Sequence, residues 1–261
     1  MRRAVAGLFT LALASAAACR RAPEPFGPYT AFLPVAIRSN NPGKPQWAPK
    51  ISIANPGTSA AVVRLTRWPP DAPDAEETVY TLAPGETRSV AARIPPSTVA
   101  SLFFEGKSPF EVSAAIVDRR RLAPSLPVPA LEADALARPL DRLVVGPIVD
   151  TSAERSHFCF TWPGVERDAV PFRVRVRLTA PSGGLLWEGT FVLTGLPYLV
   201  DDPWRRFHLP PGTAFDVETT FLGGVRGRPV ARGMWVYGVT TDRATGVSRF
   251  LPTRVLRASA R

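Results

Sequence analysis

Proline and glycine interrupt this sequence so often that long helices have little room to form. The 261 residues include 29 Pro and 19 Gly, and these two residue types are the strongest local breakers of helices. Between them lie short runs rich in β-branched and aromatic residues, and the helical period of about 3.6 residues is almost absent. The sequence therefore predicts an all-β fold.

Turns divide the first half of the chain into seven predicted strands. Asn55-Pro56-Gly57 and Ala83-Pro84-Gly85-Glu86 each combine a proline, which fixes φ, with a glycine, which supplies a positive φ. Seven strands in about 100 residues is the density of one β-sandwich, and we assign this domain to residues 29–130. The expected strands are Phe32–Ile37, Lys50–Ala54, Ala61–Arg67, Glu77–Leu82, Thr87–Ala92, Ala100–Glu105 and Glu111–Asp118.

The second half, residues 140–256, is predicted to be a second β-sandwich, with a linker over residues 131–139 that holds one helical turn. Landmarks such as Pro56-Gly57 and Pro163-Gly164 recur between the halves, and their separation grows along the chain, as loop insertions into a duplicated domain would require. The expected strands are Leu143–Val149, His157–Thr161, Phe172–Leu178, Leu185–Leu193, Tyr198–Val200, Ala214–Leu222 and Val230–Val239.

Several motifs of the first half specify turns. They are Phe32-Leu33-Pro34-Val35, Trp47 followed by Ile51-Ser52-Ile53-Ala54-Asn55-Pro56-Gly57, Leu82-Ala83-Pro84-Gly85-Glu86-Thr87 and Ser108-Pro109-Phe110-Glu111-Val112. With these motifs the chain resembles a family of secreted bacterial immunoglobulin-like β-sandwich repeats, over residues 29–130 and more weakly over 140–256, where Trp162 replaces the Asn. The resemblance implies two tandem immunoglobulin-like domains that serve surface display, adhesion or assembly, and it carries over no catalytic residue.

The first eighteen residues have the pattern of a signal peptide. Met1-Arg2-Arg3 is a short basic segment, Ala4–Ala14 is apolar but too short to span a bilayer, and small residues precede Cys19. Ala16-Ala17-Ala18-Cys19 resembles the bacterial lipobox, whose cysteine is alkylated with diacylglycerol, although Ala replaces the usual Leu. We predict a signal peptide over residues 1–18 and lipidation of Cys19. Ordinary cleavage and secretion is the alternative.

The predicted location follows from this leader. Residues 19–28 are rich in proline and are expected to form an extended stalk between a lipid anchor and the first domain. The chain is therefore expected in the outer membrane or periplasm, held to the membrane by its lipid. Its net charge of +10 would suit nucleic acid in a cytosolic protein, but export excludes that partner and favours an envelope protein or an anionic glycan.

One strand carries the clearest alternation in the chain. In Phe172-Arg173-Val174-Arg175-Val176-Arg177-Leu178 every second residue is apolar, so the three Arg project from one face of a sheet. Arg173, Arg175 and Arg177 are the candidate anion-binding residues, because spaced guanidinium groups suit phosphate or carboxylate polymers. The alternative is that they only keep the sheet soluble.

Candidate catalytic and metal-binding residues are scarce. His157 and Cys159 face one side of a predicted strand, but His208 is the only other His and Cys19 the only other Cys, so no metal set is completed. A disulfide between the two cysteines would compete with lipidation. Asp201-Asp202 lacks the spacing of a calcium loop and is expected to form a turn. We expect no catalytic residue, no metal and no cofactor.

Six Trp exceed what two sandwich cores need. Trp68 and Trp204, each next to a proline, either cap the sandwich ends or stack on sugar rings. The sequence thus favours a non-catalytic, exported, lipid-anchored structural or binding module of the bacterial cell envelope. The alternative is a carbohydrate- or anion-binding accessory subunit of a surface complex.

Overall fold

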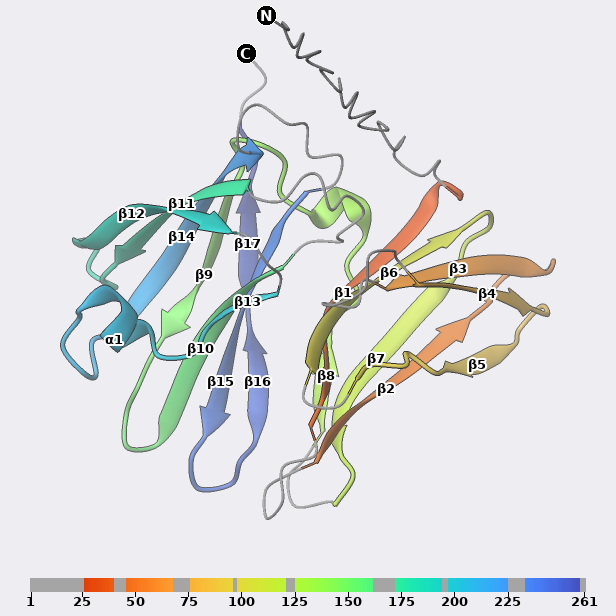
Figure 1. The fold of residues 1–261 in the computed structure, drawn as a ribbon, viewed down its shortest axis with the longest axis horizontal. Helices are drawn as coiled ribbons and strands as arrows, with labels where there is room; N and C mark the ends of the chain where they lie inside the picture. The colour runs from red at the N-terminus through yellow and green to blue at the C-terminus, as the bar shows by residue number, and fades with distance from the viewer. Residues whose placement is uncertain are drawn as a thin grey trace, which may run out of the picture.

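The computed structural model describes residues 26–39, 46–67, 76–95, 98–120, 125–161, 172–193, 197–224 and 233–258. In these ranges the chain is all-β, as predicted, and is arranged as small antiparallel sheets (Figure 1). The predicted signal peptide, Cys19 and most of the predicted stalk lie outside the described residues. No helix in the described ranges is long and apolar enough to cross a membrane.

The N-terminal half consists of eight strands: β1 (Tyr29–Arg38), β2 (Trp47–Ala54), β3 (Ala61–Arg67), β4 (Glu76–Leu82), β5 (Thr87–Val90), β6 (Thr98–Gly106), β7 (Glu111–Asp118) and β8 (Leu126–Val128). They form two four-stranded sheets with the orders β1-β6-β3-β4 and β5-β2-β7-β8. All neighbouring pairs are antiparallel.

The C-terminal half contains β9 (Arg142–Ile148), β10 (Glu154–Thr161), β11 (Phe172–Thr179), β12 (Leu185–Leu193), β13 (Tyr198–Val200), β14 (Phe215–Gly224), β15 (Trp235–Asp242), β16 (Ser248–Leu251) and β17 (Thr253–Leu256). Its sheets have the orders β12-β11-β14-β9-β17 and β13-β10-β15-β16. A short helix, α1 (Pro203–Phe207), follows β13, and a single 3-10 turn, Ala133–Ala135, lies between the halves.

The two halves share one strand order. If β9 to β16 are matched in turn to β1 to β8, each four-strand order of the first half reappears in the second, and among the described strands β17 alone has no counterpart. β1, the strand of the first half that matches β9, is an edge strand of its sheet. In the second half β17 pairs with β9 at the corresponding edge and covers it. The strand order is thus repeated, while duplication of an immunoglobulin-like domain, which the recurring landmarks suggested, stays a prediction.

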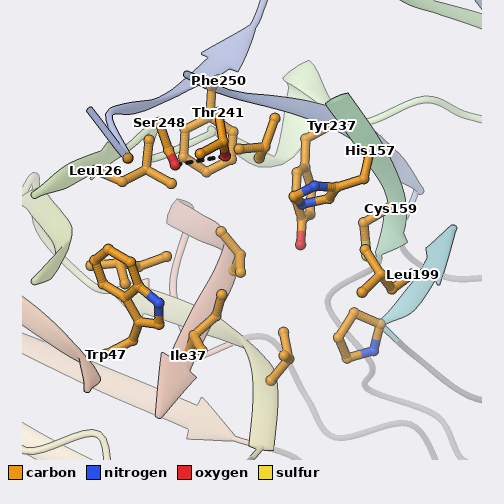
Figure 2. A pocket seen from close by; sticks show the side chains of 16 residues that line it. Ile37, Trp47, Leu126, His157, Cys159, Leu199, Tyr237, Thr241, Ser248 and Phe250 are labelled. Carbon is orange, nitrogen blue, oxygen red and sulfur yellow. Dashed lines mark hydrogen bonds between the residues drawn. The ribbon is translucent and has the colours of Figure 1, made fainter. Parts of the chain in front are cut away.

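The two central strands of sheet β13-β10-β15-β16, β10 and β15, are buried on both faces over most of their length. On β10 the side chains of Phe158 and Phe160 are fully buried on one face, and Cys159 between them is 1% exposed on the other. Phe158 packs against Phe207 of α1, whereas Cys159 faces the N-terminal half (Figure 2). Alternation of buried and exposed residues is therefore lost over Phe158–Thr161, because both faces of this part of β10 are covered.

The segment between the halves is hydrogen-bonded to both of them. Leu131 exchanges backbone hydrogen bonds of 2.6 and 2.9 Å with Phe32 of β1, and Ala137 exchanges bonds of 2.8 and 2.9 Å with Met234. The apolar side chains of both halves form one continuous cluster. The predicted linker is therefore packed into the molecule; the domain boundaries themselves stay a prediction.

Asp141 lies at the start of β9 and is held by the chain's last described residues. Its side chain is buried, it accepts hydrogen bonds from the backbone N–H groups of Arg138 (2.9 Å) and Ala258 (2.8 Å), and it pairs with the Arg257 guanidinium at 2.8 Å. Burial by itself would raise the pKa of Asp141, but the two N–H donors and the guanidinium outweigh it and lower that pKa. The carboxylate thus ties β9 to the C-terminal segment.

Candidate functional site

A cavity of about 430 Å³ lies where the two halves meet. Its walls come from β1, β2, β6, β7 and β8 on one side and from β10, β13, β15, β16 and the turn before β16 on the other (Figure 2). The lining residues share the property that none carries a formal charge when His is neutral: Val35, Ile37, Trp47, Val99, Ile116, Leu126, His157, Cys159, Pro197, Leu199, Tyr237, Val239, Thr241, Gly246, Ser248 and Phe250.

The pairing of β10 with β15 sets the chemistry of one cavity wall. Cys159 is opposite Tyr237 and His157 is opposite Val239, so these four side chains share one face of the sheet. The hydroxyl of Thr241 on β15 and that of Ser248 on the neighbouring strand β16 hydrogen-bond to each other at 2.9 Å. The wall therefore offers an apolar surface with a few hydroxyl, thiol and imidazole groups.

The thiol in this wall is held in its neutral form. Cys159 is a free cysteine, and burial raises the pKa of its thiol to about 12, against the lowering effect of a hydrogen bond with the Tyr237 side chain. Burial also raises the pKa of Tyr237, as does its contact with Cys159. Since the thiolate is the nucleophilic form of cysteine, Cys159 is not activated for covalent chemistry.

His157 lies at one end of the cavity, beside Cys159 and Leu199, while Trp47 and Leu126 lie at the other end (Figure 2). Burial lowers the pKa of His157; nearby Asp201 raises it, and nearby Arg155 lowers it further. The imidazole is therefore neutral at pH 7 and offers one N–H donor and one acceptor nitrogen.

The sequence suggested that His157 and Cys159 could form half of a metal site, and the described residues supply no further ligand. Among the described residues no group of three His, Cys, Asp or Glu side chains is arranged to hold a metal ion. The two side chains do share one face, as the two-residue spacing predicted, and both line the cavity. Their setting suits contact with a bound molecule better than ligation.

A second, more polar hollow of about 370 Å³ runs along β13 and α1, and we name it the α1 groove. It is lined by Tyr198, Leu199, Val200, Asp201, Asp202, Arg205, Arg206 and His208. Asp202 is the N-cap of α1, because its carboxylate accepts the Arg205 backbone N–H at 3.1 Å. The sequence predicted a turn at Asp201-Asp202, whereas Asp202 also begins helix α1, which the sequence analysis did not predict.

Aromatic packing fixes the position of α1 beside the sheets. The Phe207 ring contacts the rings of Trp187 (4.7 Å between centroids), Phe191 (6.0 Å) and Phe158 (6.2 Å). The Trp187 ring lies over Gly189, where an added Cβ would come within 2.3 Å of the ring. Gly189 is thus required by close approach of the indole.

The three candidate anion-binding residues do not share one environment. Val174, Val176 and Leu178 are fully buried, so the predicted alternation along β11 is confirmed. Arg177, however, pairs with Glu188 on β12 (3.2 Å) and Glu218 on β14 (3.8 Å).

Arg173 and Arg175 are exposed and have no carboxylate partner in the described part of the chain. The face thus offers two unpaired guanidinium groups, and anion binding there stays a prediction.

The tryptophans divide between structure and the cavity. Trp204 is buried, donates its indole N–H to the Thr213 carbonyl at 2.8 Å and packs on Phe215, so it caps the second half. Trp47 lines the cavity. Trp68 and Trp162 lie outside the described residues.

Sequence reasoning missed the cavity because its walls are far apart in the chain. One signal was available: Phe158–Thr161 of β10 and Trp235–Thr240 of β15 are unbroken buried runs, which indicates a sheet with both faces covered there. That pattern shows that a second layer exists but does not show which strands supply it.

Comparisons with known proteins give little support for any function. No family model and no curated protein matches this chain. Among solved structures, a protein described as Thermotoga maritima 1070 is similar to it with 17% identity and a TM-score of 0.30, over 41% of this chain and 91% of that one.

Proposed function

We propose that this chain is a non-catalytic binding module of the bacterial cell envelope, built from two tandem immunoglobulin-like β-sandwiches. The equal strand order of the two halves supports the tandem arrangement. The leader pattern ending at Cys19 supports export and a lipid anchor, with the outer membrane or periplasm as the location. The bound molecule would occupy the cavity between the halves.

The observation that carries this proposal is the uncharged cavity with its neutral polar groups. Its volume of about 430 Å³ falls in the range of small-molecule sites, roughly 300 to 1,000 Å³, which are mostly apolar with a few placed polar groups. The thiol and phenol have raised pKa values and the imidazole a lowered one. A neutral apolar site of this kind binds a ligand without offering an activated nucleophile.

The test is binding of N-phenyl-1-naphthylamine, a neutral apolar dye that fluoresces in dry surroundings. We expect saturable fluorescence that Val99→Phe abolishes, because Val99 is half-buried in the cavity wall and the larger ring takes up its space. Val192→Phe, on an exposed position of β12, is the matched control and should bind normally. Equal binding by both variants would refute the cavity as the site.

The anchor is tested separately, since it does not depend on the cavity. Mass spectrometry of the mature N-terminus should show a diacylglyceryl group on Cys19, and Cys19→Ser should move the protein to the soluble fraction. A mature chain that begins at another residue, or an unmodified thiol, would contradict this prediction.

A second candidate function rests on the two unpaired Arg side chains of β11. We propose that Arg173 and Arg175 support binding of an anionic glycan, with Arg177 contributing less because Glu188 and Glu218 already engage it. Changing all three to Gln should abolish salt-sensitive binding to an acidic glycan. Unchanged binding at low salt would leave solubility as the role of these residues.

A further inference from the structure

The apolar cavity and the α1 groove lie on two sides of one residue. Leu199 of β13 lines both of them and is 49% exposed. It lies opposite Cys159 in the β10–β13 pairing, at the end of the cavity that also holds His157 (Figure 2). Asp201 of the groove is close enough to His157 to influence its charge. An uncharged hollow and a charged one therefore adjoin at the free edge of β13.

The α1 groove has more positive charge available than negative. Asp202 is engaged as the cap of α1, and Asp201 pairs with Arg155 at 3.7 Å. Arg206 bonds to the Tyr198 hydroxyl at 3.4 Å and lies over the Phe191 ring, contacts that leave its charge uncompensated. Arg205 has no carboxylate partner within the described ranges. Within the described ranges these two guanidinium groups thus lack a carboxylate partner and can meet an anion.

We propose that the cavity and the α1 groove form one binding site for a single-chain anionic amphiphile. Its hydrocarbon chain lies in the cavity between the halves, and its anionic head is held by Arg205 and Arg206. This inference rests on the proposed function, because it names the ligand class for the same cavity. A carboxylate and a phosphate satisfy the same two guanidinium groups, so a fatty acid and a lysophospholipid share the required chemistry.

The size of the cavity admits a ligand larger than one aromatic ring. At about 430 Å³ it is nearly three times the roughly 150 Å³ cavity that accepts one benzene. Its uncharged walls exclude a head group that carries charge, whereas the groove next to Leu199 can receive one. The neutral His157 at the junction can donate one hydrogen bond to the head. A ligand with separate apolar and anionic ends matches this sequence of surfaces.

Two titration series on the full mature chain test the proposal. In the first, saturated fatty acids of increasing length displace N-phenyl-1-naphthylamine, below their critical micelle concentrations. Each added methylene should tighten binding about fourfold until the cavity is full, from about 0.8 kcal/mol per buried CH₂. In the second, dodecanoate is compared with dodecanol, and the acid should bind about three- to tenfold tighter at low salt, with the difference shrinking as salt is added.

Variants separate the two parts of the site. Arg205→Gln with Arg206→Gln should remove the preference for the acid and leave dodecanol binding unchanged. Arg254→Gln, an exposed position of β17, is the matched control and should keep the preference. Arg205→Gln alone, which leaves the contacts of Arg206 intact, should lose part of the preference and guards against a folding defect in the double variant.

The outcomes distinguish this inference from the proposed function. Equal affinity for acid and alcohol, or an acid preference that survives the double Gln variant, refutes the anionic head site while the cavity still binds. Failure of every fatty acid and of dodecanol to displace the bound dye refutes this inference while the cavity still binds the dye, whereas failure of the dye itself to bind refutes both. A parallel titration with lysophosphatidylglycerol identifies the source: tighter binding than the matching fatty acid indicates a phosphate head, and weaker binding a carboxylate.

Discussion

Gly189 allows the Trp187 indole to lie flat across β12, and replacing its hydrogen by a methyl group should disturb the packing around α1. In Gly189→Ala the new Cβ would sit 2.3 Å from one indole carbon and 2.6 Å from the next, well inside van der Waals contact. The ring must move, and it loses contact with Phe207, whose centroid is 4.7 Å away.

The expected destabilisation is about 1–3 kcal/mol, the usual cost of overpacking an ordered cluster. For a chain of this size each kcal/mol lowers the melting temperature by roughly 2–4 °C. Thermal and urea unfolding, followed by near-ultraviolet circular dichroism, measure both quantities. Gly184→Ala is the matched control, because a Cβ there meets nothing within 4 Å, and it should be neutral.

A double-mutant cycle decides whether the indole is the cause. With Trp187→Leu in place the clash is absent, so adding Gly189→Ala should cost nothing or stabilise the strand slightly, since Gly weakens strand interiors. If Gly189→Ala costs the same with and without the indole, or is as neutral as Gly184→Ala, the assigned role of Gly189 is wrong.

Three further predictions concern charge and burial. The lowered pKa of Asp141 means that its contribution is fully present above about pH 4, the unfolded value, and is lost as the pH falls through the lower folded value. Asp141→Asn should therefore cost about 1–3 kcal/mol at pH 7, and acid titration of unfolding should bring the two proteins together; parallel curves would contradict this. Val176→Asp places an unpaired charge in the core and should unfold the second half at a cost of several kcal/mol, whereas Arg175→Gln should change stability by about 0.5 kcal/mol or less; calorimetry on both tests the assigned faces of β11. Finally, Cys159, whose thiol pKa is about 12, should resist a thiol reagent at pH 8 until the protein is unfolded, and rapid labelling of the folded protein would refute its burial.

Local patterns predicted the strands well where one face meets water or a turn closes the run. The bounds expected for β3, β7, β12 and β13 agree with the structure to the residue. In each case the limits are set by nearby residues, such as the Pro181-Ser182-Gly183-Gly184 turn before β12. Such signals lie within the segment itself, and one sequence is enough to find them.

What the sequence did not predict depends on distant contacts or on very short elements. β8, β16 and β17 have three or four residues and contain or adjoin Pro127 or Pro252, which reads as loop. α1 has five residues, although the Asp202 cap followed by Pro203 was a usable start signal. The cavity requires Trp47 and Tyr237, from different halves of the chain, to line one hollow, and no local rule relates positions so far apart.

The pairing of the strands also determines which half can be completed first during synthesis, which starts at the N-terminus. Every strand of the first two sheets has appeared by Val128, so that half can close before the second half is made. In sheet β12-β11-β14-β9-β17 the strand that is made first, β9, pairs with the strand that is made last, β17. β9 therefore lacks this partner until Thr253–Leu256 have been made. The second half therefore stays incomplete until Thr253–Leu256 have been made, and the finished first half offers the surface on which it assembles.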